Sequence, residues 1–318
     1  MRLVVVTSAN GRVGIDVAMR VLKAGGSALD AVEAGTRLVE DNAEDHSVGT
    51  AGLPNLLGEV ELDASIMDGR TLGAGAVAAL KGYPNPISVA RRVMTDLPHV
   101  LLVGEGAARF AEGAGFDQAE LLTAETRRIW GERMAGILPP NASPGDRQYY
   151  AKMREWAGMA TDPEKVAGTV NVIARDREGN IASAVSTSGW AWKYPGRVGD
   201  SPLIGAGNYC DNRYGAAACT GRGEMAIRAA TARSLVLYLK AGMSLAQAMT
   251  EAMTDLWALE DPYYGSMNLV AMDKDGTPGA ATNGSATYVY QTEEMDAFAE
   301  AERLVVTRPE DGGTTYVH

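Results

Sequence analysis

The chain has 318 residues, long enough for two small domains or one large layered domain. Its composition, 46% hydrophobic and 22% charged with 37 glycines and 13 prolines, is that of a globular protein and excludes disordered, collagen-like and coiled-coil chains. The 29 basic and 40 acidic residues give a net charge of −11, so nucleic acid and anionic membranes are not expected partners.

The beginning of the chain, MRLVVVTSANGR, has too short an apolar run for a signal peptide, and no apolar run reaches the roughly 18 to 20 residues of a membrane helix. We therefore expect a cytoplasmic protein. Cys210 and Cys219 are expected to be buried free thiols, since nothing indicates export.

Several local patterns predict the elements of the first half. Residues 2–8 are typical of a strand, and a helix is expected over about 13–23. Ser27 and Asp30 have the spacing of a capping box before a second helix. Residues 59–67 alternate apolar and polar side chains, which predicts a half-buried strand. Asn85 followed by proline predicts a capped helix start.

The second half contains two similar stretches, residues 171–185 and 268–282, each with two apolar runs around a charged turn that contains glycine. Both patterns predict β-hairpins, and the sheets should therefore be largely antiparallel. Ser244 and Gln247 repeat the capping-box spacing before another helix. We expect one α+β domain over residues 1–318, with helices outside two stacked sheets, and a mobile linker at residues 136–168.

Some chemistries find no support in the sequence. The only histidines are His46, His99 and the last residue, His318, and none has a recognisable catalytic setting. CxxC, HxH and HExxH spacings are absent, so no metal site is predicted. There is no phosphate-binding loop, and the Gly-x-Gly pairs lack the third glycine of a dinucleotide fingerprint. If the protein is a hydrolase, its base is therefore not expected to be histidine, and a nicotinamide-binding oxidoreductase is a weak rival.

At Gly168-Thr169-Val170 the sequence resembles the threonine-type asparaginases among the N-terminal-nucleophile hydrolases: glycosylasparaginases, plant-type asparaginases and isoaspartyl peptidases. The resemblance covers nearly the whole chain. It is carried by SVGTAGLPNLLGEVELDASIMDG at 47–69, STSGW at 186–190, PGRVGDSPLIGAGNYCD at 195–211 and CTGRGE at 219–224. It implies a four-layer αββα sandwich of two mostly antiparallel sheets flanked by helices.

The resemblance also implies a self-cleaving precursor, in which Thr169 attacks the carbonyl carbon of Gly168. Residues 1–168 and 169–318 would become the α and β fragments. Glycine lacks a Cβ and can adopt the bent geometry that this step needs. The freed α-amino group of Thr169 has a reference pKa near 7.7 to 8.0, so it can act as the base for its own hydroxyl.

Other matched positions imply further roles. Thr187 would orient the nucleophile, although a strand-end threonine could also bond only its own backbone. Arg197 and Asp200 would hold the α-carboxylate and α-ammonium of an aspartyl substrate, unless they simply pair with each other.

The last motif, at 219–224, supplies the remaining positions. Thr220 and Gly221 would form the oxyanion hole, with Gly223 beside the substrate, and a glycine-bearing turn before a helix is the alternative. Trp190, Trp192 and Tyr194 fit a pocket wall or the core equally well.

Two departures bear on the substrate. The sequence has Ala9 where glycosylasparaginases carry tryptophan, and Gly168 where they carry aspartate. L-asparagine and β-aspartyl peptides are therefore favoured over glycosylated asparagine. The resemblance implies no organic cofactor, a possible structural sodium ion near residues 62–67, and a homodimer of αβ units. A scaffold that never cuts itself is the alternative of another class.

Overall fold

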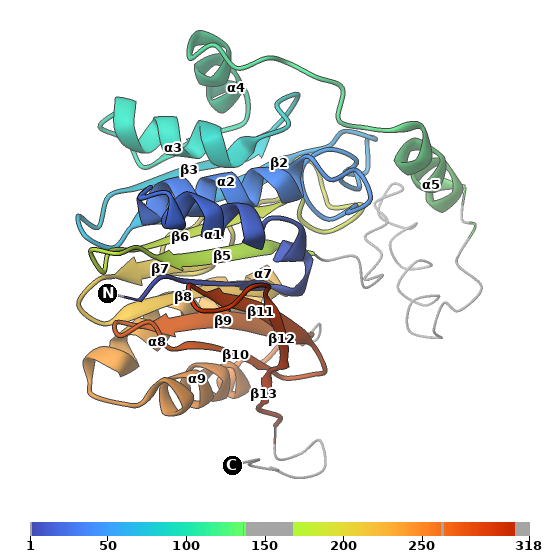
Figure 1. The fold of residues 1–318 in the computed structure, drawn as a ribbon. Helices are drawn as coiled ribbons and strands as arrows, with labels where there is room; N and C mark the ends of the chain where they lie inside the picture. Colours follow the sequence, from blue (N-terminus) through green and yellow to red (C-terminus); the bar gives the residue numbers. More distant parts are fainter. Residues whose placement is uncertain (1, 136, 138–167, 262–263, 309–318) are drawn as a thin grey trace.

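The computed structural model of the chain describes residues 2–135, 137, 168–261 and 264–308. The linker predicted at 136–168 therefore lies outside the described residues, apart from residue 137 and Gly168. The described part combines helices with two β-sheets, which confirms the α+β class (Figure 1).

The larger sheet has eight strands, in the spatial order β12 (Ala299–Glu302), β11 (Thr287–Thr292), β1 (Val4–Ser8), β5 (Val170–Arg175), β6 (Ile181–Thr187), β2 (Leu62–Asp68), β3 (Ala74–Leu80) and β4 (Leu101–Val103). The smaller sheet has the order β13 (Leu304–Val305), β10 (Pro278–Thr282), β9 (Met267–Asp273), β8 (Gly215–Gly221) and β7 (Asn208–Asp211). All pairings are antiparallel except β3 with β4 and β10 with β13, so the largely antiparallel sheets are confirmed.

The helices pack on the outer faces of these sheets (Figure 1). The larger sheet is covered by α1 (Ile15–Lys23), α2 (Ala28–Glu40) and α3 (Pro86–Asp96), and the smaller by α8 (Thr231–Lys240) and α9 (Leu245–Thr254). The remaining helices of the described residues are α4 (Gly104–Gly113), α5 (Ala124–Met134), α7 (Gly223–Ala229) and the 3₁₀ turns η1 (Ala9–Val13) and η2 (Asp255–Ala258).

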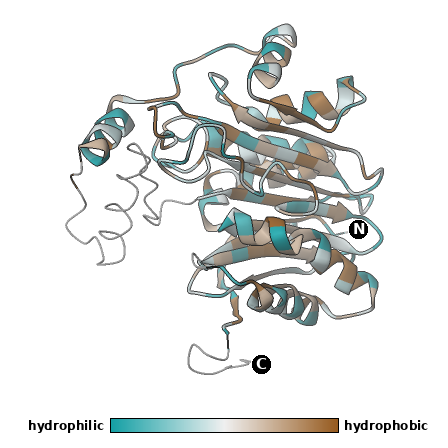
Figure 2. Ribbon diagram, turned by 180° about the vertical axis from the view of Figure 1, so that it is seen from behind, coloured by the Kyte–Doolittle hydropathy of each residue, from teal (hydrophilic) through white to brown (hydrophobic). Residues whose placement is uncertain are grey.

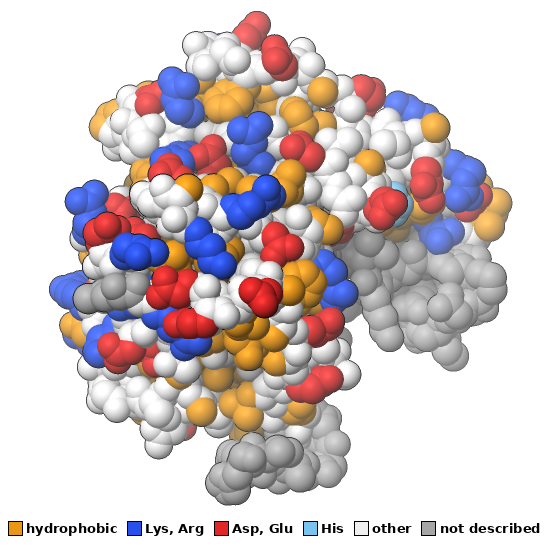
Figure 3. All heavy atoms as spheres, viewed as in Figure 1, with side chains coloured by type: hydrophobic (Ala, Val, Ile, Leu, Met, Phe, Trp, Pro, Cys, Tyr) orange, Lys and Arg blue, Asp and Glu red, His pale blue; other side chains and the backbone are white. Residues whose placement is uncertain are grey.

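Three apolar clusters follow this arrangement, and Figure 2 shows hydrophobic residues running along the strands. One lies between α1–α3 and the larger sheet, one between the two sheets, and one between the smaller sheet and α8 and α9. Each sheet is thus covered on both faces, which is why many strand residues have no solvent exposure. On the face in Figure 3, acidic and basic side chains are intermixed.

Several local expectations are confirmed. Capping boxes are present at Ser27 with Asp30 and at Ser244 with Gln247. The two predicted hairpins are β5–β6 and β9–β10. Among the described residues the cysteines are free and buried, and no helix is long and apolar enough to cross a membrane.

Two expectations are wrong in detail. The strand predicted over 59–67 runs from Leu62 to Asp68 and is buried throughout instead of half-buried. Its polar side chains are also enclosed: Asp63 accepts from Ala79 on β3, and Ser65 donates to Ser201 in a loop. Proline does open α3, but the Asn85 side chain does not cap it. Its amide donates to Asp41 at 2.8 Å instead.

Candidate active site

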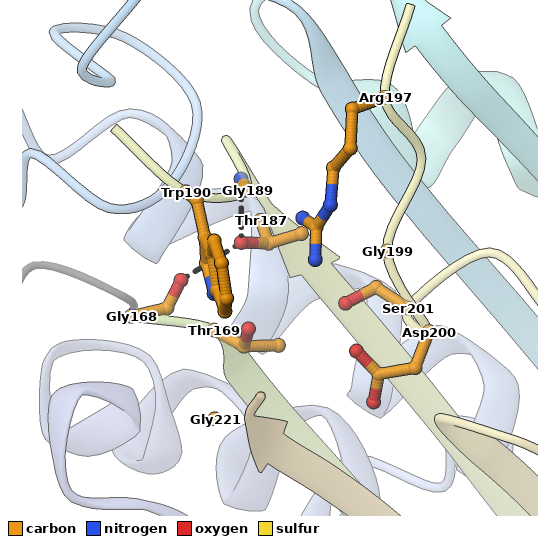
Figure 4. A pocket seen from close by; sticks show the side chains of 10 residues that line it. All are labelled: Gly168, Thr169, Thr187, Gly189, Trp190, Arg197, Gly199, Asp200, Ser201 and Gly221. Atoms are coloured by element: carbon orange, nitrogen blue, oxygen red, sulfur yellow. Dashed lines mark hydrogen bonds between the residues drawn. The ribbon is translucent and has the colours of Figure 1, made fainter. Parts of the chain in front are cut away.

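A pocket at one end of the sheets brings together most of the residues singled out in the sequence (Figure 4). Ten residues line it: Gly168, Thr169, Thr187, Gly189, Trp190, Arg197, Gly199, Asp200, Ser201 and Gly221. Thr220 and Gly223 adjoin these residues without lining the pocket. Neither His46 nor His99 lines it, and His318 lies outside the described residues.

The β5–β6 hairpin places the two threonines together. In its register Val170 faces Ser186, so Thr169, just before β5, lies beside Thr187, the last residue of β6. Thr169 is only 7% exposed, and its carbonyl oxygen accepts from the Ser8 hydroxyl at 3.3 Å. Thr169, the candidate nucleophile, is thus held at the start of β5, a central strand of the larger sheet.

The Thr187 hydroxyl does more than bond its own backbone. It donates to the carbonyl oxygen of Gly168 at 2.8 Å, and it accepts from the backbone N–H of Gly189 at 2.9 Å. The donated bond polarises the carbonyl group that joins Gly168 to Thr169, which is the group a Thr169 hydroxyl would attack.

Position 168 requires glycine because the backbone there packs closely against the Ser47 side chain. A Cβ at this position would lie 1.9 Å from Ser47 Oγ and 2.2 Å from Ser47 Cβ, too close for any side chain. Its φ is not in the left-handed region, so packing against Ser47, and not an unusual backbone conformation, requires the glycine.

Arg197 and Asp200 both reach the pocket, but they do not pair with each other. The Arg197 guanidinium bonds Glu224 through Nε at 3.1 Å and Nη2 at 3.0 Å, and it lies 5.0 Å from the Trp190 ring centre. The interpretation of Arg197 and Asp200 as a simple salt bridge is therefore wrong. Glu224 aligns the guanidinium, and this pairing was not predicted from the sequence.

Asp200 is a buried carboxyl group. It is 5% exposed, and its Oδ2 has no hydrogen-bond partner among the described residues. Burial raises the pKa of Asp200 to about 7, although the nearby Arg197 charge opposes the shift. An unpartnered buried acceptor facing a pocket is suited to a cationic group of a ligand.

The CTGRGE motif lies at the end of β8 and the start of α7. Asn171 donates its side-chain amide to Thr220 Oγ1 at 2.6 Å, which leaves the hydroxyl proton of Thr220 to be donated elsewhere. Gly221 has φ +125°, and a Cβ there would lie 2.2 Å from the Ser266 carbonyl oxygen.

Gly223 lies against Asp200. A Cβ on residue 223 would approach Asp200 Oδ1 to 2.7 Å and the Asp200 nitrogen to 2.9 Å. A glycine at position 223 is therefore required for the position of the Asp200 carboxyl group. Gly223 would thus affect a ligand only through Asp200.

The three aromatic residues after Thr187 have three different environments. Trp190 lines the pocket, with the Arg222 guanidinium 4.8 Å from its ring centre. Trp192 is fully buried, and Tyr194 is 61% exposed. The sequence pattern could not separate these environments because they depend on the loop that follows β6.

Comparison with known proteins agrees with this geometry. Residues 8–299 match the family model described as asparaginase. The chain belongs to this family, and it is a hydrolase that acts on amide bonds.

Three relatives illustrate the range of the family. The chain is 40% identical to a plant-type L-asparaginase of Thermococcus kodakarensis over 85% of both chains. It is 43% identical to an N(4)-(β-N-acetylglucosaminyl)-L-asparaginase of Elizabethkingia miricola, over 74% of this chain and 63% of the relative. It is 38% identical to an isoaspartyl peptidase/L-asparaginase of Mus musculus, over 81% of this chain and 73% of the relative.

Proposed function

We propose that this protein cuts itself before Thr169 and then releases L-aspartate from β-aspartyl amides, namely L-asparagine and β-aspartyl peptides. It would be one αββα domain of the N-terminal-nucleophile hydrolase type, with residues 1–168 and 169–318 as its two fragments. The observation that carries the proposal is the contact between Thr187 Oγ1 and the Gly168 carbonyl oxygen, directly beside Thr169.

Self-cleavage begins when Thr169 Oγ1 attacks the Gly168 carbonyl carbon. The Thr187 hydroxyl stabilises the charge that develops on the carbonyl oxygen. The proton of the Thr169 hydroxyl passes to the Thr169 nitrogen as the C–N bond breaks, which leaves an ester and a free α-amino group. Water hydrolyses the ester, so that Gly168 ends in a carboxylate and Thr169 becomes an N-terminus with its hydroxyl restored.

In turnover, the α-amino group of Thr169 takes the proton of its own hydroxyl, which attacks the β-carbonyl carbon of the substrate. The amide nitrogen leaves as ammonia or an amine after receiving that proton. Water activated by the same amine then hydrolyses the acyl-enzyme and releases aspartate. Thr220 and Gly221 would provide the oxyanion hole, since the Thr220 proton is directed away from Asn171.

The pocket supplies a site for the aspartyl end of the substrate. The guanidinium of Arg197 points into the pocket, where it would bind the α-carboxylate (Figure 4). The unpartnered Oδ2 of Asp200 would accept from the α-ammonium. Both groups are preorganised, Arg197 by Glu224 and Asp200 by the close packing of Gly223.

Some features remain proposals on the family resemblance alone: a homodimer of αβ units in the cytoplasm, and a reaction without an organic cofactor. The possible structural sodium ion, held by backbone carbonyls of the loop near residues 62–67, is also a proposal on the resemblance; the strand residues themselves have their backbone paired with β3 and β6. No step of the proposed reaction uses an ion.

Glycosylasparaginase activity is the second candidate, favoured by the 43% identity to the Elizabethkingia miricola enzyme. The close fit of Gly168 against Ser47 argues against it, since that site does not admit the aspartate of glycosylasparaginases.

The test compares L-asparagine, a β-aspartyl dipeptide and glycosylated asparagine as substrates of purified protein. Aspartate release from the first two supports the proposal, and preference for the third supports the alternative. Denaturing gels monitor self-cleavage in parallel, with Thr169→Ala as the control that should stay whole and inactive. A single persistent band from the unaltered protein, with no turnover, would support the alternative that the protein is a non-catalytic scaffold that never cuts itself.

A further inference from the structure

A lysine is buried directly behind the pocket. Lys193 is 1% exposed, and its Nζ donates to the carbonyl oxygen of Glu61 at 3.0 Å. It takes no part in the chemistry proposed above. A fully buried ammonium group is unfavourable unless nearby groups stabilise its charge, so its presence calls for a physical reason.

Two buried carboxylates accompany this lysine. Glu61, just before β2, is 2% exposed, and Asp63 on β2 is fully buried. Burial lowers the pKa of Lys193, and the charges of Asp63 and Glu61 oppose this shift only in part. Lys81 also approaches Glu61, at 3.7 Å, but it is half-exposed.

The same two carboxylates hold the loop that carries the substrate-binding residues. The Glu61 oxygens accept from the backbone N–H of Gly196 at 3.1 and 3.2 Å. Asp63 Oδ2 accepts from the N–H of Gly199 at 3.3 Å, and its Oδ1 accepts from Ala79 at 2.8 Å. Gly196 directly precedes Arg197 and Gly199 directly precedes Asp200, so these bonds fix the backbone at both residues.

The ammonium group also lies against Gly189, which lines the pocket close to the Arg197 guanidinium. A Cβ on Gly189 would lie 2.9 Å from Lys193 Nζ, and Gly189 has φ +74°. Gly189 is the residue whose N–H donates to the Thr187 hydroxyl. Lys193 therefore lies between the loop of Arg197 and the segment that follows Thr187.

We infer that Lys193 is a positioning residue: its bond to the Glu61 carbonyl oxygen holds the chain at Glu61 and Asp63, so that their carboxylates hold residues 196–200 in the conformation that binds the aspartyl end of the substrate. Without the ammonium, the Glu61 carbonyl oxygen would lose its buried donor, and the chain at Glu61 and Asp63 would be held less firmly. The bonds from their carboxylates to Gly196 and Gly199 would then weaken. The inference rests on the proposed function, because the affinity it explains is that for the aspartyl substrate.

The first experiment compares Lys193→Met with the unaltered enzyme on L-asparagine, with rates expressed per cleaved chain. Turnover by the unaltered enzyme tests the proposed function separately. We expect the variant to raise KM by about tenfold or more and to change kcat by less than about threefold. Lys240→Met, at an exposed lysine on α8, is the matched control and should leave both constants unchanged. An unchanged KM in Lys193→Met overturns the inference.

A double-variant comparison separates positioning from general destabilisation. If Lys193 acts through Arg197, adding Lys193→Met to Arg197→Ala should lower kcat/KM by less than about threefold more. Independent, multiplying effects would overturn the inference. If Lys193→Met does not fold, Glu61→Gln provides the same test, because it weakens the bond to Gly196 with little change in volume. A rise in KM supports the inference, and a KM equal to that of the unaltered enzyme refutes it.

Discussion

Self-cleavage should depend on the absence of a side chain at Gly168. In Gly168→Ala, the new Cβ would lie 1.9 and 2.2 Å from the Ser47 side chain, whereas ordinary contacts are 3.4 to 4 Å. Ser47 cannot easily move away, because its N–H and hydroxyl bond Asp45 and its carbonyl oxygen accepts from Ser188 at 2.7 Å. The Gly168 carbonyl group would instead be displaced from Thr187.

Overpacking of this kind typically costs about 1 to 3 kcal/mol. If that strain falls on the reactive conformation, cleavage should slow by about 5- to 150-fold. The assay is a time course of fragment formation on denaturing gels. Gly113→Ala is the matched control, since a Cβ there meets nothing within 4 Å on helix α4.

The double variant Gly168→Ala with Ser47→Gly should recover most of the cleavage rate, because it removes the two atoms that the new Cβ would meet. The bonds made by the backbone of residue 47 are kept. A Gly168→Ala protein that cleaves as fast as the unaltered chain would refute this reasoning, and so would a double variant no faster than the single one.

Four further predictions concern the pocket. Because burial raises the pKa of Asp200 to about 7, KM for L-asparagine should rise as the pH falls through about 7, when protonation removes the acceptor; a KM independent of pH would contradict this. That folded-state pKa exceeds the ordinary aspartate value of 3.8, so the stability that the protonated acid contributes is lost as the pH rises through about 7, and Asp200→Asn should melt a few degrees higher at about pH 8. Gly223→Ala should raise KM with little effect on self-cleavage, because its Cβ would displace Asp200. Steady-state kinetics and denaturing gels check this, and slowed self-cleavage with an unchanged KM would contradict it. Thr187→Val should slow self-cleavage by about 100-fold through loss of the bond to Gly168, whereas Thr187→Ser should retain most of it, and equal rates would exclude the proposed role.

The elements that the sequence predicted well depend on neighbours in the chain. Capping boxes join residues three apart, as at Ser27 and Ser244, and hairpins join runs separated by a short turn. The pairing of Thr169 with Thr187 is also of this kind, because it follows from the register of one hairpin. The family motifs at 168–170 and 195–224 located most of the pocket.

Contacts between distant segments were decided only by the tertiary structure. Gly168 meets Ser47 across more than a hundred residues, and Lys193 meets Glu61 through a similar separation. The alternation at 59–67 predicted a half-buried strand because it cannot show that both faces of the strand are covered in the fold. Arg197 selects Glu224 because the fold brings the start of α7 beside its loop. Local patterns report short-range hydrogen bonds and periodicity, whereas burial and charge pairing depend on which distant residues the sheets bring together.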